Sequence, residues 1–226
     1  MRKQKEKHLI IPVLLHAVDV VSSIVKAVEE LRREYTARRM EPGISHVAAC
    51  LRYAFYAITR GKPVSDVVLY GTELHHWFSR HAPPALERHG CKCESEVKVT
   101  LGRLSGFADI LCDCNGIRTV VELKFTKTPN ASNPFFKWHE RQLKYYAAAV
   151  AADIGVLLMM LFDLQRYSIF HVTLDDESRR ALVREALARY EDLIHALASG
   201  TPPEPERGPY CTYCPYRHEC LNEKLA

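Results

Sequence analysis

The chain has 226 residues, of which 47% are hydrophobic and 26% are charged, and its formal net charge is +4. This composition is ordinary for a soluble globular protein and excludes an extensively disordered or fibrous chain. No run of 18 apolar residues occurs, which excludes a membrane-spanning helix. The mild positive charge is compatible with a polyanionic partner but does not require one.

The first fifteen residues combine basic side chains with a short apolar run, as a signal peptide does. His16 and Asp19 interrupt the apolar character that follows, and no small-residue cleavage site comes cleanly after it. We therefore expect an amphipathic N-terminal segment and a cytoplasmic protein that makes no contact with a membrane. The eight cysteines of such a protein need a reason other than a secreted disulfide framework.

The first part of the chain carries helical periodicity. A helix is predicted over about residues 17–40, and Pro42-Gly43 ends it. Ser45 can cap a second helix that runs to about residue 60, and Ser65 or Asp66 opens a third that ends before Pro83-Pro84.

The apolar period then changes to two, which predicts strands. Strands are expected over residues 91–101, 104–114 and 117–125, then a helix over 137–152, strands over 155–163 and 167–174, and a helix over 176–198. This order predicts an α/β fold with a central mixed sheet flanked by helices. The Cys-rich tail over residues 201–226 is too short and polar to pack alone, so we expect it to depend on a metal.

Asn115-Gly116 is a strong hairpin signal and sets a register between the second and third strands. With a two-residue turn, the residue numbers of facing positions add up to 231, so Asp109 lies opposite Glu122. Period two places Lys124 on the same face as Glu122. The other face of this hairpin is mainly apolar and is expected to be the core.

Two carboxylates opposed on a sheet repel each other, because their Cβ atoms lie only about 4.5–5.5 Å apart. Mg²⁺ or Mn²⁺ between them would remove the repulsion and would accept water and substrate phosphate as further ligands. Lys124 would reach the same water or phosphate. The alternative is a surface charge network in which Lys124 neutralises Glu122; the apolar neighbours of the trio, such as Val120, argue against it.

These residues carry a family resemblance. Gly106-Phe107-Ala108-Asp109 followed by Glu122-Leu123-Lys124 resembles the PD-(D/E)xK nuclease signature in its RecB-like form. Gln142 with Tyr146 resembles the Gln-x-x-x-Tyr motif of that group, and Gly71 with His75 resembles its Gly-x-x-x-His motif. The elements occur in the family's order.

The resemblance implies a restriction-endonuclease-like core with a defined site. Its metal ligands would be His75, Asp109 and Glu122, and its catalytic residues Asp109, Glu122, Lys124, Gln142 and Tyr146. Gly71 lies one turn before His75 and would let another backbone approach the histidine. The alternatives are that His75, which has His76 beside it, is a core histidine and that Gln142 and Tyr146 only pack.

The tail contains Cys211-x2-Cys214-x5-Cys220, and this spacing of thiols is typical of a soft-metal site. A fourth ligand is needed, and Cys50 is the candidate, so a cluster would join the two ends of the chain. The alternative is a local zinc site formed by Cys211, Cys214, His218 and Cys220, with Cys50 as a buried core cysteine.

The cysteine pattern resembles the iron–sulfur RecB-like nucleases, above all the CRISPR-associated exonuclease family (the fourth Cas family). That family has one early cysteine, often followed by Pro-Arg, and three late ones; the sequence Cys50-Leu51-Arg52 departs slightly from this. The resemblance implies a cluster on Cys50, Cys211, Cys214 and Cys220, with [4Fe–4S] favoured and [2Fe–2S] as the alternative.

The same resemblance implies a metal-dependent exonuclease that acts on DNA with single-stranded ends or overhangs. Its role would be the processing of spacer precursors in CRISPR adaptation, with the integrase proteins as partners. The alternatives are the nuclease module of a recombination or repair helicase–nuclease system and a catalytically silent DNA-binding scaffold. We expect a helical segment over residues 1–65, a nuclease core over 66–200 and a cluster-binding segment over 201–226 that packs with the first.

Two further patterns leave alternatives open. Cys91, Cys93, Cys112 and Cys114 fall on apolar strand faces and are expected to be buried core cysteines, with a second metal site or an interstrand disulfide as alternatives. Residues 128–139 interleave aromatic and basic side chains, which suits stacking on single-stranded DNA. Phe136 and Trp138 would equally suit the core face of the following helix.

Overall fold

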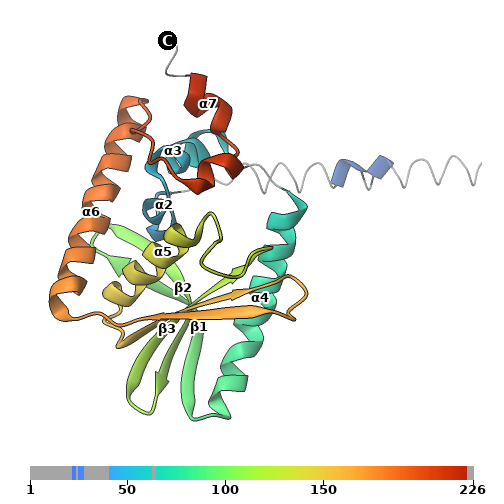
Figure 1. Ribbon diagram of the computed structural model, residues 1–226, viewed down its shortest axis with the longest axis vertical. Coiled ribbons are helices and arrows are strands. Elements are labelled where there is room, and N and C mark those ends of the chain that lie inside the picture. The colour runs from blue at the N-terminus through green and yellow to red at the C-terminus, as the bar shows by residue number, and fades with distance from the viewer. Residues whose placement is uncertain (1–21, 24, 28–40, 63–64, 223–226) are drawn as a thin grey trace, which may run out of the picture. The chain divides into compact units, whose positions relative to one another are not determined.

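The structure is a computed structural model that describes residues 22–23, 25–27, 41–62 and 65–222 (Figure 1). The chain divides into two units, residues 1–39 and 40–226, and the second contains the sheet and every candidate site residue. The predicted helix over residues 17–40 lies largely outside the described residues, although 22–23 and 25–27 are helical. No helix in the described ranges is long and apolar enough to cross a membrane.

Five strands form one mixed sheet in the order β1-β2-β3-β4-β5. They are β1 (Cys91–Leu101), β2 (Leu104–Cys114), β3 (Ile117–Phe125), β4 (Ile154–Met160) and β5 (Tyr167–Val172). β3 and β4 pair in parallel, and the other neighbours pair antiparallel. The parallel pair requires a crossover, which α5 (Phe136–Ala149) supplies. The predicted α/β fold with a central mixed sheet and flanking helices is confirmed.

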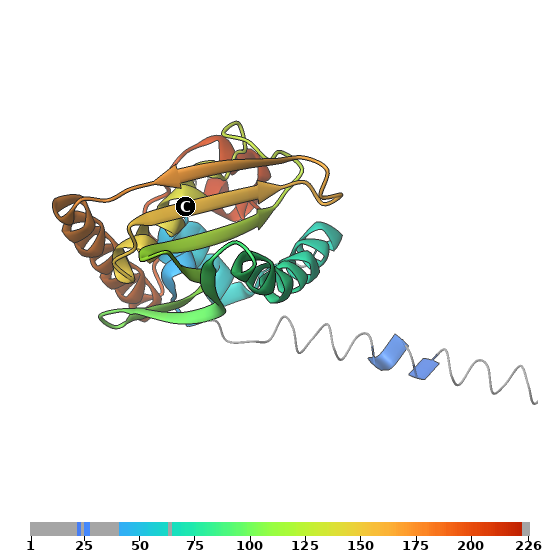
Figure 2. The ribbon, with the colours of Figure 1, turned by 90° about the horizontal axis from the view of Figure 1, so that it is seen from below.

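Helices cover both faces of the sheet, so the expectation of a single core face is wrong. On one face, Val120 and Leu157 belong to the main core, together with residues of α2 (Ile44–Ala48), α3 (Leu51–Arg60), α5 and α6 (Asp176–Ser199). On the other face, Ile110 and Leu123 pack against α4 (Asp66–Glu87). Figures 1 and 2 show α4 beside the β1–β2 hairpin and α6 on the opposite flank. The carboxylate face is therefore interior rather than exposed, because α5 covers it.

The predicted register of the β2–β3 hairpin is confirmed from Cys114–Ile117 to Ile110–Val121. Asn115 and Gly116 both adopt positive φ, at 57° and 85°, as this two-residue turn requires. Asp113 Oδ1 accepts a hydrogen bond from Gly116 N at 2.7 Å, which closes the turn.

α4 continues through Pro83 and Pro84, so the prediction that it ends before them is wrong. A proline in a helix interior removes a backbone hydrogen bond and costs about 3 kcal/mol. Ala82 and Leu86, on either side of the prolines, pack into the core cluster beneath α4. We attribute the continued helix to this burial, which offsets the lost hydrogen bonds.

The prediction of one continuous helix over residues 45–60 is wrong. The structure has two helices there, α2 (Ile44–Ala48) and α3 (Leu51–Arg60). Ala49 and Cys50, which separate them, are extended. Arg189 of α6 donates hydrogen bonds to the carbonyl oxygens of Val47 and Ala49, at 2.6 and 2.5 Å. Arg189 therefore satisfies backbone groups that a continuous helix would satisfy internally, and Cys50 is left at the start of α3.

The cysteines of β1 and β2 form two interstrand disulfides, Cys91–Cys114 and Cys93–Cys112. The expectation of free buried cysteines is therefore wrong, and the interstrand alternative is correct. Each bridge joins residues that are direct partners in the β1–β2 register, with Cα atoms 4.1 Å apart. Directly opposed strand positions bring side chains close enough to bond.

Reduction of these disulfides should lower the free energy of unfolding. The bridged residues are 23 and 19 positions apart, and closing a loop of this size contributes about 3 kcal/mol by restricting the unfolded chain. The second bridge adds less because it is nested in the first. Denaturant unfolding with and without dithiothreitol measures the loss. A variant with all four cysteines replaced by serine should not respond, and an equally unresponsive parent would show that the bridges do not form.

Candidate active site and cysteine site

Three neighbouring strands each bring one acidic side chain to the same region. Asp109 of β2 accepts a hydrogen bond through Oδ2 from the backbone N–H of Leu123 at 2.6 Å, and this places it beside Glu122 of β3. The paired β2–β3 positions stop at Ile110–Val121, so Asp109 and Glu122 are not the directly paired residues that the predicted register made them. On the other side, the β1–β2 register brings Glu96 next to Asp109.

His75 of α4 completes this group. Its Nε2 lies 3.0 Å from Asp109 Oδ1, and its Nδ1 lies 3.6 Å from Glu96 Oε1. One ligand atom from each of these three residues lies within 4.8 Å of the other two. These three residues could together hold a single metal ion.

Glu122 is fully buried, with 0% exposure. Its Oε1 accepts a hydrogen bond from Lys124 Nζ, whereas Oε2 has no hydrogen-bond partner in the described part of the chain. Burial, followed by the charge of Asp109, raises the pKa of Glu122. A buried oxygen without a partner costs about 1–3 kcal/mol or more. The donor set therefore fits a divalent cation, which would satisfy Oε2 and offset the repulsion from Asp109.

Lys124 lies between the carboxylates and α5. Burial alone would lower its pKa, but Glu122 and Asp109 outweigh burial and raise it, so the ammonium group stays charged. On α5, burial and the charge of Lys124 lower the pKa of His139 to about 3, so this histidine is neutral. Lys124 therefore provides a cationic hydrogen-bond donor next to the candidate metal ligands.

Gln142 and Tyr146 share a face of α5 that points toward the carboxylates. Gln142 and the backbone of Phe107 form hydrogen bonds with the Tyr146 hydroxyl. Burial, and then the charges of Glu122 and Asp109, raise the pKa of Tyr146, so the hydroxyl keeps its proton. The structure thus brings both residues to the region that the resemblance implies.

Gly106 explains why glycine begins the motif that ends in Asp109. A Cβ at this position would lie 2.6 Å from the Tyr146 hydroxyl oxygen and 3.1 Å from Ile44 Cβ. Only glycine leaves room for the tyrosine. Gly71 has no such role among the described residues, because its Cβ would meet only the ring of Phe162, at an ordinary 3.7 Å. The expectation that Gly71 allows a backbone to approach His75 is therefore wrong.

Gly106→Ala should lower the free energy of unfolding by about 1–3 kcal/mol, the usual cost of overpacking a core. Tyr146→Phe removes the oxygen nearest to the new methyl group, so the alanine should cost clearly less in that background. A double-mutant cycle of unfolding free energies tests the coupling. Strictly additive effects would contradict the close contact.

Glu96 was not among the predicted site residues, although the sequence contains a signal for it. With a two-residue turn at Gly102-Arg103, the residue numbers of facing positions in β1 and β2 add up to 205. This register places Glu96 opposite Asp109, and the observed pairs on either side of them agree with it. Glu96 also adopts φ 52°, a left-handed conformation that costs a non-glycine residue about 1–2 kcal/mol. Such strained residues concentrate at functional sites.

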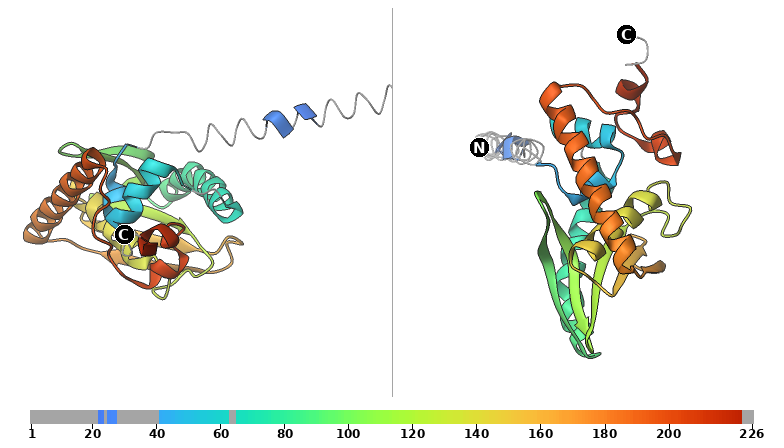
Figure 3. Two further views of the ribbon diagram at one scale, coloured as in Figure 1. Left: turned by 90° about the horizontal axis from the view of Figure 1, so that it is seen from above. Right: turned by 90° about the vertical axis from the view of Figure 1, so that its left-hand side faces the viewer.

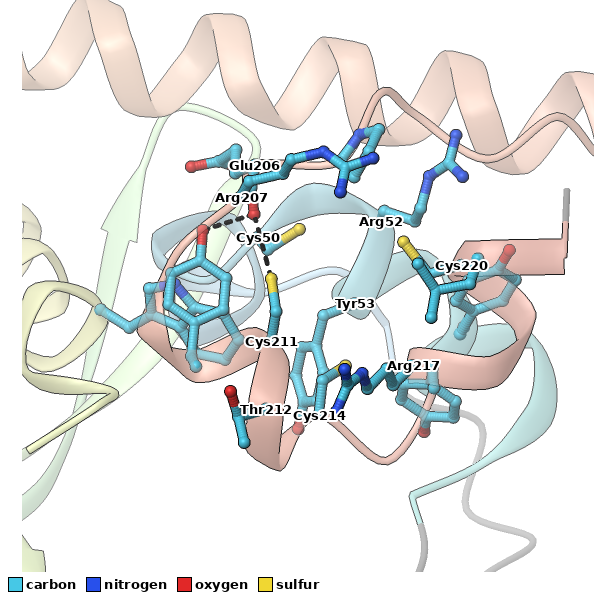
Figure 4. Close-up of a pocket in the computed structure, with 16 residues that line it drawn as sticks. Cys50, Arg52, Tyr53, Glu206, Arg207, Cys211, Thr212, Cys214, Arg217 and Cys220 are labelled. Carbon is cyan, nitrogen blue, oxygen red and sulfur yellow. Dashed lines mark hydrogen bonds between the residues drawn. The ribbon is translucent and has the colours of Figure 1, made fainter. Parts of the chain in front are cut away.

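A second site contains cysteines that the disulfides do not use. Cys50, Cys211, Cys214 and Cys220 are free, and all four line one cavity of about 160 Å³ (Figure 4). Cys50 precedes α3, and the others lie on or next to a 3-10 helix (Pro209–Tyr213) and α7 (Arg217–Asn222). Figure 3 shows this C-terminal segment beside α3, and Tyr216 joins the two by donating a hydrogen bond to the Gly61 carbonyl at 2.6 Å.

The surroundings of this cavity suit an anionic thiolate complex. Burial, and then the charges of the other three cysteines, raise the pKa of the Cys214 thiol, which a bound metal would reverse. Arg52, Arg207 and Arg217 also line the cavity and can balance negative charge. His218 is exposed and is not among the lining residues.

The aromatic residues at the start of α5 pack inside the protein. Trp138 is 9% exposed and lies against Tyr210, with ring centroids 4.4 Å apart, beside the cysteine cavity. Phe136 packs on Phe170 at 4.8 Å. Of the two alternatives for these residues, the structure supports core packing, because Trp138 is buried and Phe136 packs against the main core.

Comparisons with known proteins agree with this architecture. The family described as the PD-(D/E)XK nuclease superfamily matches residues 22–221. A search of curated proteins finds no match to the sequence. The crystal structure of SSO0001 is similar with a TM-score of 0.57 and 19% identity, over 89% of this chain and 96% of that chain, which shows a shared fold. The crystal structure of an alkaline exonuclease from Laribacter hongkongensis has a TM-score of 0.49 and 15% sequence identity, over 74% of this chain and 95% of that chain.

Proposed function

Because the chain belongs to the PD-(D/E)XK nuclease superfamily, we propose that it is a metal-dependent deoxyribonuclease that degrades DNA from single-stranded ends. The observation that carries this proposal is the buried group formed by His75, Asp109, Glu122 and Lys124. It combines carboxylates that need a cation with a lysine that stays charged. An intact set of this kind argues against a catalytically silent scaffold.

In this proposal His75, Asp109 and Glu122 hold Mg²⁺ or Mn²⁺, and Glu96 is a further ligand that the geometry supports. A bound ion of this type supplies an activated water and stabilises charge on the phosphate. Lys124 donates a hydrogen bond to the attacking water or to a phosphate oxygen. Gln142 and Tyr146, both neutral donors, orient the scissile phosphate against the carboxylates.

We also propose an iron–sulfur cluster on Cys50, Cys211, Cys214 and Cys220, which line a single cavity. Four thiolates can hold either a [4Fe–4S] or a [2Fe–2S] cluster, and the resemblance to the iron–sulfur RecB-like nucleases favours [4Fe–4S]. The shared cavity supports Cys50, rather than the exposed His218, as the fourth ligand. Residues 66–200 then act as the nuclease core, and the segments 1–65 and 201–226 supply the cluster.

This combination of nuclease centre and four cysteines supports a role in CRISPR adaptation. The protein would shorten the ends of spacer precursors before the integrase proteins insert them. The test of partnership is size-exclusion chromatography of the protein with integrase proteins from its own source. Independent elution at micromolar concentrations would favour a role in general DNA repair.

The activity is tested with end-labelled linear single-stranded DNA. Cleavage should require Mg²⁺ or Mn²⁺, stop in EDTA and leave closed circular single strands intact. Robust cleavage of circles would show that the protein is an endonuclease. Full activity in EDTA would contradict the metal-dependent mechanism.

A further inference from the structure

One residue contacts both segments that form the cysteine cavity. Glu206 precedes the three tail cysteines, and its Oε1 accepts a hydrogen bond from the backbone N–H of Leu51 at 3.3 Å, across 155 positions of sequence. Leu51 directly follows Cys50. The carbonyl oxygen of Glu206 accepts a hydrogen bond from the Tyr210 hydroxyl at 2.6 Å and lies 3.9 Å from Cys211 Sγ. Glu206 thus reaches the immediate neighbourhood of two candidate ligands.

Two arginines from different helices hold the Glu206 carboxylate. Arg189 of α6 donates to Oε1 at 2.6 Å, and Arg141 of α5 donates to Oε2 at 3.1 Å. Arg189 also binds the carbonyl oxygens of Val47 and Ala49, and Arg141 binds that of Ala48 at 3.3 Å. The network therefore fixes the backbone directly before Cys50 as well as the backbone after it.

The three side chains depend on one another. Burial opposes ionisation of Glu206, but the hydrogen bonds and charges of Arg189 and Arg141 outweigh burial and keep its pKa below the usual range. Without the carboxylate charge, the two partly buried guanidinium groups would lose the anion that they share, and Arg141 would keep only its longer ion pair with Glu185, at 3.8 Å. Removing one partner of a buried ion pair disturbs a structure much more than removing one from the surface.

We propose that Glu206 is a positioning residue of the cysteine site, which holds Cys50 and Cys211 at the separation that one cluster requires. This inference rests on the iron–sulfur half of the proposed function. Only short helices order the tail between α6 and its last described residue. Glu206 adds to the contacts that Arg52 and Tyr216 make with the carbonyl oxygens of Pro203 and Gly61, and among these three residues it is the one that binds the backbone next to Cys50. The network also extends to the catalytic helix, since Arg141 directly precedes Gln142 on α5.

The test compares three variants for their retention of iron. Glu206→Gln keeps the size of the side chain and removes its charge, and it should lose iron and visible absorbance at least about tenfold faster in the presence of a chelator, as loss of an outer partner does at other metal sites. Glu206→Asp keeps the charge on a shorter side chain and should lie between Glu206→Gln and the parent. Glu204→Gln is the matched control, because Glu204 is exposed and only two positions away.

The possible results distinguish a failure of the Glu206 role from a failure of the proposed iron–sulfur cluster. A parent protein without iron would overturn the cluster itself. An iron-containing parent with a Glu206→Gln variant that loses iron at the parent's rate would overturn the positioning role alone. If Glu206→Gln does not fold, Glu206→Asp decides, and iron loss at the parent's rate would again overturn it. Melting curves of the iron-free proteins identify a merely structural role, which would lower the melting temperature and leave iron release unchanged.

Discussion

Asp109→Asn and Glu122→Gln should each reduce the rate of DNA cleavage by about a thousandfold. Removal of one group that stabilises transition-state charge lowers the rate of other enzymes by about this factor. Both carboxylates face the same buried region, and Glu122 offers an oxygen without a partner. Each substitution keeps the shape of the side chain and removes the charge that a divalent ion needs. A cleavage assay on linear single-stranded DNA measures the effect.

The metal-stripped variants should melt close to the parent. Each variant removes one of two buried like charges, which is stabilising, and also removes the charged partner of a neighbouring side chain, His75 for Asp109 and Lys124 for Glu122, which is destabilising. Added Mg²⁺ or Mn²⁺ should raise the melting temperature of the parent more than that of either variant, since binding to the folded state stabilises it. Lys124→Ala should bind metal nearly normally and fail in cleavage.

Asp113→Asn is the matched control, because Asp113 is an exposed carboxylate on the same strand. This variant should cleave DNA and respond to metal as the parent does. Retention of both activity and the metal-induced shift by Asp109→Asn would show that the active site lies elsewhere.

Cys50→Ala should remove the iron from a protein that is otherwise purified brown, with about four iron atoms per chain and an equal amount of acid-labile sulfide if the cluster is [4Fe–4S]. The reason is geometric: Cys50 lines the cavity with the three tail cysteines, although it lies far from them in the sequence. Elemental analysis and visible absorbance measure the loss.

Two controls accompany this variant. The double variant Cys93→Ser/Cys112→Ser removes one disulfide without leaving a free thiol and should keep its iron. His218→Ala should also keep its metal, because His218 lies outside the cavity lining. A colourless parent with one zinc ion per chain, lost on His218→Ala and retained on Cys50→Ala, would establish the local zinc site instead.

The sequence by itself determined the features that depend on neighbouring residues. Asn115-Gly116 specifies the turn of the β2–β3 hairpin, and the alternation of the flanking strands extends the pairing, so the register up to Ile110–Val121 could be predicted. The spacing of Gln142 and Tyr146 likewise places both on one face of a helix. The order of helices and strands, and hence the α/β class, follows from periodicity in the same way.

Only the tertiary structure decided the features that depend on residues far apart in the chain. The break before Cys50 exists because Arg189, from the last long helix, binds the carbonyl groups of Val47 and Ala49. α4 passes through Pro83 and Pro84 while Leu86 packs against the sheet. The local sequence contains neither partner, so local patterns favour the wrong answer at both places.

The two sites differ in the same respect. Asp109, Glu122 and Lys124 are organised by one hairpin, and the sequence predicts their proximity directly. The roles of the eight cysteines depend on tertiary contacts. Four of them form disulfides because they lie opposite one another across β1 and β2. The other four are free and line one cavity, although Cys50 is far from the other three in the sequence. Strand alternation determines only the face on which a cysteine lies; its partner is determined by strand pairing and by the packing of helices from both ends of the chain.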